Sequence, residues 1–119
     1  QTCALPIWLE IIRTVRNRYD GRVRNPFNEY ECGHWYARAM SSYSLLQALT
    51  GIRYDAVDKT LYIDPATDGD FTSFLSTAGG FGTVELKNGK PAVTTYYGNI
   101  DIRHCMLRGK KAKVRTVNL

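Results

Sequence analysis

The chain has 119 residues, of which 44% are hydrophobic and 23% are charged, as is typical of a globular domain. It contains no apolar run of the roughly 18–20 residues that a membrane-spanning helix needs. The formal net charge is +5, and basic residues concentrate around residues 13–24 and 108–115. Such groups can contact nucleic acid, but more often they form solvated faces, so we expect no nucleic-acid partner.

The first seven residues, QTCALPI, match the translation of a common sequencing adapter. We therefore expect that residues 1–7 are not biological and that natural sequence upstream of them is missing. Without Cys3, the remaining cysteines Cys32 and Cys105 form no C-x-x-C pair. Neither a disulfide framework nor a structural zinc site is expected, because structural zinc usually takes four closely grouped ligands.

Two helices are predicted in the first part of the chain. Apolar residues recur at helical spacing over residues 8–19, and Gly21 ends this helix because glycine readily takes the left-handed conformation. Residues 22–33 have no sustained period and contain a proline, which predicts a loop. Residues 34–49 are rich in Ala, Met, Leu and Gln and are followed by Gly51, which predicts a second, deeply packed helix.

The sequence after this glycine predicts β-strands. Runs of β-branched and aromatic residues cover residues 52–55, 60–64, 71–76, 83–86, 90–97, 100–107 and 112–117. Asn88-Gly89 suits the positive φ angles of a type I′ turn, so the fourth and fifth runs should form a hairpin. Arg108-Gly109 should join the last two runs in a second hairpin. Two helices followed by antiparallel hairpins is an α+β pattern.

The stretch FNEYECGHWYARAM, at residues 27–40, carries most of the candidate chemistry. Glu29 and Glu31 lie two apart in an extended loop, where Cα atoms are about 6.5–7 Å apart, a separation compatible with glycosidase carboxylates. Adjacent loop residues rarely flank a bond from opposite sides, which disfavours a local catalytic pair. A zinc site formed by Glu31, Cys32 and His34 would lack a fourth ligand. A catalytic Cys32 with His34 as its base would lack a third group to orient the histidine.

A ligand-binding interpretation fits this stretch better. His34 and Arg38 are four residues apart and project from one face of the second predicted helix. The loop places Glu29 and Glu31 near the helix N-terminus, whose partial positive charge favours carboxylates. Carboxylates accept hydrogen bonds from diols, arginine donates two in a planar fork, and the nearby rings can pack on a sugar. The alternative is a buried ion pair between Arg38 and either glutamate.

Several motifs in order along the chain carry a family resemblance. They are VRNRYDG at residues 15–21, RNPFNEYECG at residues 24–33, YARAMSS at residues 36–42, GIRYD at residues 51–55 and AGGFGT at residues 78–83. This sequence resembles glycoside hydrolase family 116, which includes β-glucosidases and the non-lysosomal glucosylceramidase. The likeness covers roughly residues 14–86.

The resemblance implies an α+β fragment in which residues 8–51 are the last helices of an (α/α)6-barrel catalytic domain. Residues 52–119 would be a β-rich extension of that domain, formed by antiparallel hairpins. The intact parent would hydrolyse β-linked glucosides with retention. Its two catalytic carboxylates would lie in the missing N-terminal part of the chain, so the fragment is expected to be inactive by itself.

The resemblance also implies roles for residues of the quoted stretch. Glu29 and Arg38 match positions that bind glucose hydroxyls around O4 and O6, and Glu31 and His34 belong to the same substrate-binding group. Family members often have the sequence E-C-G-D-H-Y, whereas this chain has His34-Trp35 directly after the glycine. The resemblance therefore does not predict which sugar is bound. No metal or organic cofactor is implied, and the partner is a β-linked glycoside. The alternative function is a non-catalytic carbohydrate-binding or structural module.

Overall fold

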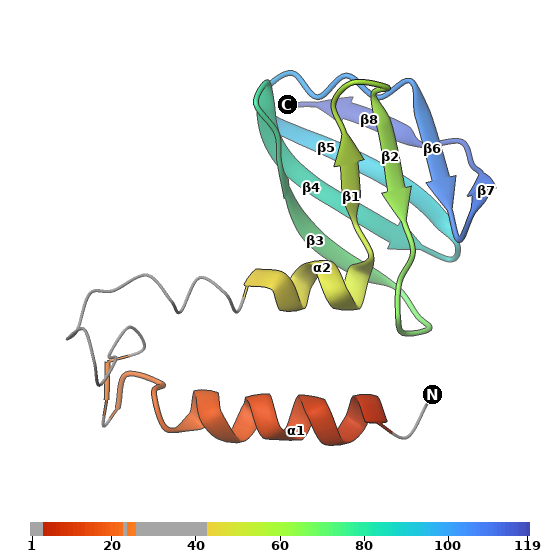
Figure 1. The fold of residues 1–119 in the computed structure, drawn as a ribbon. Coiled ribbons are helices and arrows are strands. Elements are labelled where there is room, and N and C mark those ends of the chain that lie inside the picture. Colours follow the sequence, from red (N-terminus) through yellow and green to blue (C-terminus); the bar gives the residue numbers. More distant parts are fainter. Residues whose placement is uncertain (1–3, 23, 26–42) are drawn as a thin grey trace. The chain divides into compact units, whose positions relative to one another are not determined.

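The structure is a computed structural model that describes residues 4–22, 24–25 and 43–119 (Figure 1). The chain divides into two compact units, Gln1–Ser42 and Tyr43–Leu119. The described part of the first unit contains one helix, and the second unit contains a short helix and eight strands.

Helix α1 (Ala4–Asn17) is the main described element of the first unit. It confirms the helix expected from the period of residues 8–19, although it begins and ends earlier along the chain. Gly21 follows it with a φ of 92°, the left-handed conformation that only glycine adopts without strain. The backbone amide of Arg22 donates a 3.0 Å hydrogen bond to the Asp20 carboxylate, and the Arg22 guanidinium pairs with the same carboxylate. These contacts lower the pKa of Asp20.

Helix α2 (Ser44–Thr50) opens the second unit. Gly51 ends it with a φ of 60°, and the Gly51 amide donates a 2.8 Å hydrogen bond to the Gln47 carbonyl. A Cβ on Gly51 would lie 2.0 Å from the carbonyl oxygen of Asp64, so the close approach of this backbone also requires glycine. Residues 34–42 of the predicted second helix lie outside the described residues.

Eight strands form two four-stranded sheets (Figure 1). Sheet 1 has the order β1-β2-β6-β7 and contains β1 (Arg53–Asp55), β2 (Thr60–Ile63), β6 (His104–Leu107) and β7 (Lys110–Lys111). Sheet 2 has the order β3-β4-β5-β8 and contains β3 (Phe71–Ser76), β4 (Gly80–Lys87), β5 (Lys90–Gly98) and β8 (Arg115–Asn118). Both sheets are mixed, because β2 pairs with β6 and β5 pairs with β8 in parallel.

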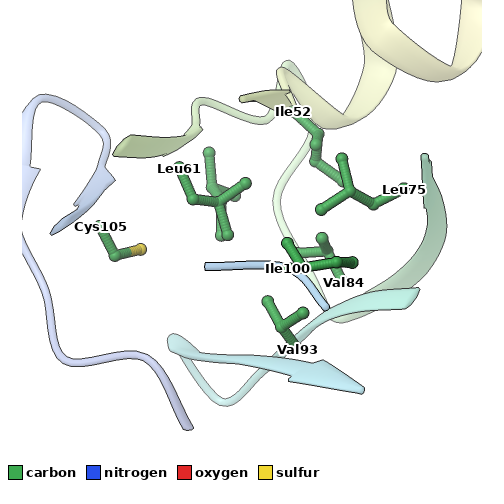
Figure 2. Close-up of a cluster of buried hydrophobic side chains, with 8 residues drawn as sticks. Ile52, Leu61, Leu75, Val84, Val93, Ile100 and Cys105 are labelled. Carbon is green, nitrogen blue, oxygen red and sulfur yellow. The ribbon is translucent and has the colours of Figure 1, made fainter. Parts of the chain in front are cut away.

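The hydrophobic core lies between the two sheets (Figure 2). It joins residues of both sheets with two from connecting segments: Leu61, Ile63 and Cys105 from sheet 1, Leu75, Val84 and Val93 from sheet 2, and Ile52 and Ile100. Every second residue of β4 is buried, as expected for a strand that packs one face against a core. Burial of these alternate side chains is the main source of stability for the sandwich.

The predicted turns are present, but the last predicted hairpin is incomplete. Asn88 and Gly89 have φ angles of 49° and 69°, as the type I′ prediction between β4 and β5 requires. Arg108 and Gly109 have φ angles of 49° and 75° between β6 and β7. The return along β6 is short: β7 has two residues, and the Ala112 amide adds one 2.9 Å hydrogen bond to the Cys105 carbonyl. Residues 115–117 belong to β8, which pairs with β5 in the other sheet.

The predicted fold class is wrong. The second unit is a small β-rich domain with two mixed sheets and one short helix, and the described part of the first unit is one short helix. The described residues are not the last helices of an (α/α)6 barrel followed by a purely antiparallel extension. The physical reason is the period of burial. The core is formed by alternate residues of strands, whereas a helical barrel needs long helices whose buried residues recur with a period of 3.6. The two described helices have 14 and 7 residues.

Candidate functional site

The residues predicted to bind a sugar lie outside the described residues. These are Glu29, Glu31, His34 and Arg38, and Cys32 lies outside as well. Their roles in sugar binding therefore remain predictions from the sequence. The candidate site described next is built from residues of the second unit.

One face of sheet 2 packs against the core. On its outer face, the chemical character of the side chains changes from one end of the strands to the other. The outer face comprises Thr72, Phe74 and Ser76 from β3, Phe81, Thr83, Glu85 and Lys87 from β4, Lys90, Ala92, Thr94 and Tyr97 from β5, and Arg115 and Val117 from β8. Cross-strand pairs join Lys87 to Lys90, Thr83 to Thr94, and Phe81 to Tyr97. Cations thus lie near the β4–β5 turn, Phe74 and the two threonines lie in the middle, and Phe81 and Tyr97 lie at the opposite end.

A β-bulge explains why two rings meet on this face. Gly82 pairs with Thr95 but Phe81 pairs with Tyr97, so Tyr96 is an extra residue in β5. An extra residue reverses the alternation of side chains beyond it, which brings Tyr97 to the side of Phe81. A Cβ on Gly82 would lie 1.9 Å from the carbonyl oxygen of Thr94, so a glycine is needed where the strands approach at the bulge.

Phe74, Phe81 and Tyr97 form what we call the aromatic cluster. The ring centroids of Phe74 and Phe81 are 6.2 Å apart, and those of Phe81 and Tyr97 are 5.8 Å apart with an interplanar angle of 21°. Both distances fall in the range of favourable aromatic pairs. The three residues keep 45%, 42% and 71% of their surface exposed. Rings held in a row by neighbouring strands can offer apolar surface to a planar or ring-shaped ligand.

A cleft of about 700 Å³ lies at the other end of the sheet, beside the β4–β5 turn. Four basic residues line it: Lys87, Lys90, Lys113 and Arg115. We call this set the cationic cleft. Glu85 is the one carboxylate among the lining residues, and Pro91, Ala92, Ala112 and Val114 supply apolar walls. The lining therefore carries three more positive than negative charges and favours an anionic ligand.

The cations of the cleft differ from other basic residues of the same unit. Arg108 pairs with Asp68 at 2.9 Å, and Lys59 pairs with Asp101. The Lys59 contact lowers the pKa of the Asp101 carboxyl. Within the part of the chain that the structure describes, none of the four cleft cations forms a salt bridge or a side-chain hydrogen bond. Their donors are free for an external anion.

Two other kinds of chemistry find no support among the described residues. No group of three or more His, Cys, Asp or Glu side chains in the described ranges could hold a metal ion. Cys105 is buried in the core, and its burial raises the pKa of the thiol, so it is poorly placed to act as a nucleophile.

Sequence reasoning missed the outer face of sheet 2. The AGGFGT motif includes Phe81, and the basic residues at 108–115 form one group in the sequence. Its members separate in the fold, because Lys113 and Arg115 line the cleft while Arg108 pairs with Asp68. The alternation of Phe81, Thr83, Glu85 and Lys87 predicts a shared face, but it does not predict which rings of β3 and β5 lie beside it.

Comparison with known proteins adds no relative. No protein-family model matches the chain, and no curated protein matches its sequence. In the described ranges, no helix is long and apolar enough to cross a membrane.

Proposed function

We propose that this chain is the C-terminal, non-catalytic part of a retaining β-glycosidase. The observation that carries the proposal is the ordered run of motifs over residues 15–42, which resembles glycoside hydrolase family 116. Glu29 and Arg38 then bind sugar hydroxyls, with Glu31 and His34 beside them. The catalytic carboxylates belong to sequence upstream of the chain.

The described residues are compatible with a non-catalytic role. A retaining glycosidase needs two carboxyl groups about 5–5.5 Å apart across the scissile bond. The cationic cleft has one carboxylate in its lining, that of Glu85. The cleft by itself therefore does not supply a catalytic pair, and the proposal assigns the chemistry to residues of the parent enzyme.

The test is hydrolysis by the restored parent protein. The reading frame is extended upstream, and kcat/KM is measured on an aryl β-glucoside for the parent and for Glu29→Ala and Arg38→Ala. Each substitution leaves sugar hydroxyls unpaired in the site, so we expect a loss of roughly tenfold to a hundredfold in kcat/KM. Lys111→Gln, which changes an exposed cation of β7, is the control and should keep full activity. A restored parent that hydrolyses no β-glycoside would refute the proposal.

The second candidate is a non-catalytic carbohydrate-binding module, and the aromatic cluster favours it. Exposed rings on a sheet face can pack against the C–H surface of sugar rings, and Thr83 and Thr94 lie in the adjacent cross-strand row. Binding of a glycan by the 119-residue chain without hydrolysis would support this function. The absence of binding to any glycan would remove it.

A further inference from the structure

The outer face of sheet 2 places two different kinds of contact group at its two ends. Phe81 and Tyr97 of the aromatic cluster occupy the end at the bulge, with Phe74 beside Thr83, and the cationic cleft occupies the end at the β4–β5 turn. Lys90 and Tyr97 are seven residues apart on β5, which corresponds to about 23 Å along a strand. A single sugar or a small anion cannot reach both ends, so a ligand that uses the whole face is a chain of several units.

The distribution of charge along the face distinguishes between kinds of polyanion. In the four strands of sheet 2, the basic residues are Lys87, Lys90 and Arg115, and all three lie at the cleft end. A nucleic acid carries a phosphate on every nucleotide and needs cations along its whole track. The aromatic end of this face offers rings and threonine hydroxyls in place of cations. This arrangement suits a chain that is anionic in some units and neutral in others.

The apolar surface on this face is small for a protein partner. A stable protein interface buries about 800 Å² on each side and has an apolar core. In the strands of sheet 2 the exposed large apolar side chains are the three rings, Tyr96 at the bulge and Val117 at the sheet edge. Hydroxyl groups and free cations make up the rest of the outer face, together with Glu85 and Ala92.

We propose that the outer face of sheet 2 binds an acidic glycan built from both neutral and anionic sugar units. The anionic groups lie in the cationic cleft, where Lys90 and Arg115 donate to them. Neutral sugar rings pack against Phe81 and Tyr97. The inference deepens the carbohydrate-binding function, on which it rests, by naming the ligand class and the surface.

The test is calorimetric titration of the 119-residue chain with defined probes over a series of NaCl concentrations. Hyaluronan oligosaccharide, which alternates a uronate with a neutral sugar, is the primary probe. Heparin tests whether sulfate groups bind in place of carboxylates. A neutral cello-oligosaccharide and a single-stranded oligothymidylate are the comparison ligands. We expect the tightest binding for a glycan that carries anionic groups, with affinity that falls as salt rises.

Two variants separate the ends of the face. Lys90→Gln with Arg115→Gln removes two charge-assisted contacts and should weaken binding by about tenfold or more and flatten its salt dependence. Tyr97→Ala, at a residue with 71% exposure, should weaken binding without changing the salt dependence. Lys110→Gln with Lys111→Gln removes two cations of sheet 1 and is the matched charge control, expected to bind as the wild type does. Circular dichroism checks that each variant is folded.

Several outcomes would overturn the inference. Equal affinity for the neutral oligosaccharide would leave the carbohydrate-binding function standing but refute the acidic ligand. Equal or tighter binding of oligothymidylate would indicate a general polyanion site or a nucleic-acid site. An unchanged affinity in the folded Tyr97→Ala variant would show that the aromatic end takes no part. Hydrolysis by the restored parent is a separate measurement, so failure of the glycosidase proposal does not affect these results.

Discussion

Substitution of Gly82 by alanine tests the bulge that organises the outer face of sheet 2. The added Cβ would lie 1.9 Å from the carbonyl oxygen of Thr94 and 2.9 Å from the Cα of Thr95. A carbon and a carbonyl oxygen normally approach no closer than about 3.3 Å, so the Thr94 carbonyl must move by more than about 1 Å. Thr94 is held on both sides, because it pairs with Thr83 of β4 and with Val117 of β8.

The expected cost is large because the obstacle is backbone and not the end of a flexible side chain. Overpacking typically destabilises a protein by about 1–3 kcal/mol, and we expect Gly82→Ala to reach the upper end, about 3 kcal/mol. For a domain of 60–100 residues, each kcal/mol lowers Tm by about 4–8 °C, which gives a loss of about 12–24 °C.

Thermal unfolding of the full chain, followed by circular dichroism, measures this loss. Thr72→Ala changes an exposed residue of β3 and is the control, expected to stay within about 0.5 kcal/mol of the wild type. A Gly82→Ala variant as stable as this control would mean that β4 and β5 do not approach at the bulge as described. The geometry that brings Phe81 beside Tyr97 would then be wrong as well.

Three further predictions concern the core and the titrating groups. Leu61→Ala removes a fully buried core side chain and should cost about 2–5 kcal/mol in urea unfolding. The pKa of Asp101 is lowered by Lys59, so the pair stabilises the fold above the ordinary value of 3.8 and less as the pH falls below it. The stability difference between wild type and Asp101→Asn should therefore be larger at pH 7 than at pH 3, and equal differences would contradict this. In a background with the other cysteines replaced by serine, buried Cys105 should react with a thiol reagent only after unfolding.

Local signals in the sequence predicted most of the strands. The type I′ turn at Asn88-Gly89 and the alternating residues around it led to β4 and β5, and residues 71–76 match β3. Turn chemistry and a period of two are properties of a few neighbouring residues, so a single sequence displays them. The same is true of the helix end at Gly51.

The arrangement of the strands could not be predicted in the same way. The parallel pairs β2–β6 and β5–β8 join segments that are distant along the chain, and no turn motif marks such a pair. The prediction that residues 112–117 return beside β6 used only the nearby Arg108-Gly109 turn. The resemblance to a helical-barrel family also directed the fold prediction toward helices, whereas the described core is built from strands. The cationic cleft depends on the β5–β8 pair, so it could not be predicted either.

The glycines of the AGGFGT motif have a structural explanation that does not depend on any ligand. A Cβ on Gly80 would lie 2.3 Å from the Tyr97 carbonyl oxygen, and a Cβ on Gly82 would lie 1.9 Å from the Thr94 carbonyl oxygen. Both glycines are therefore needed for β4 and β5 to approach at the bulge, with Phe81 between them on the outer face. Effects of a substitution on stability can therefore be distinguished from effects on glycan binding, which a binding measurement alone would not do. Loss of Gly82 should reduce stability and glycan binding together, whereas loss of the exposed Tyr97 ring should reduce binding and leave the sandwich folded.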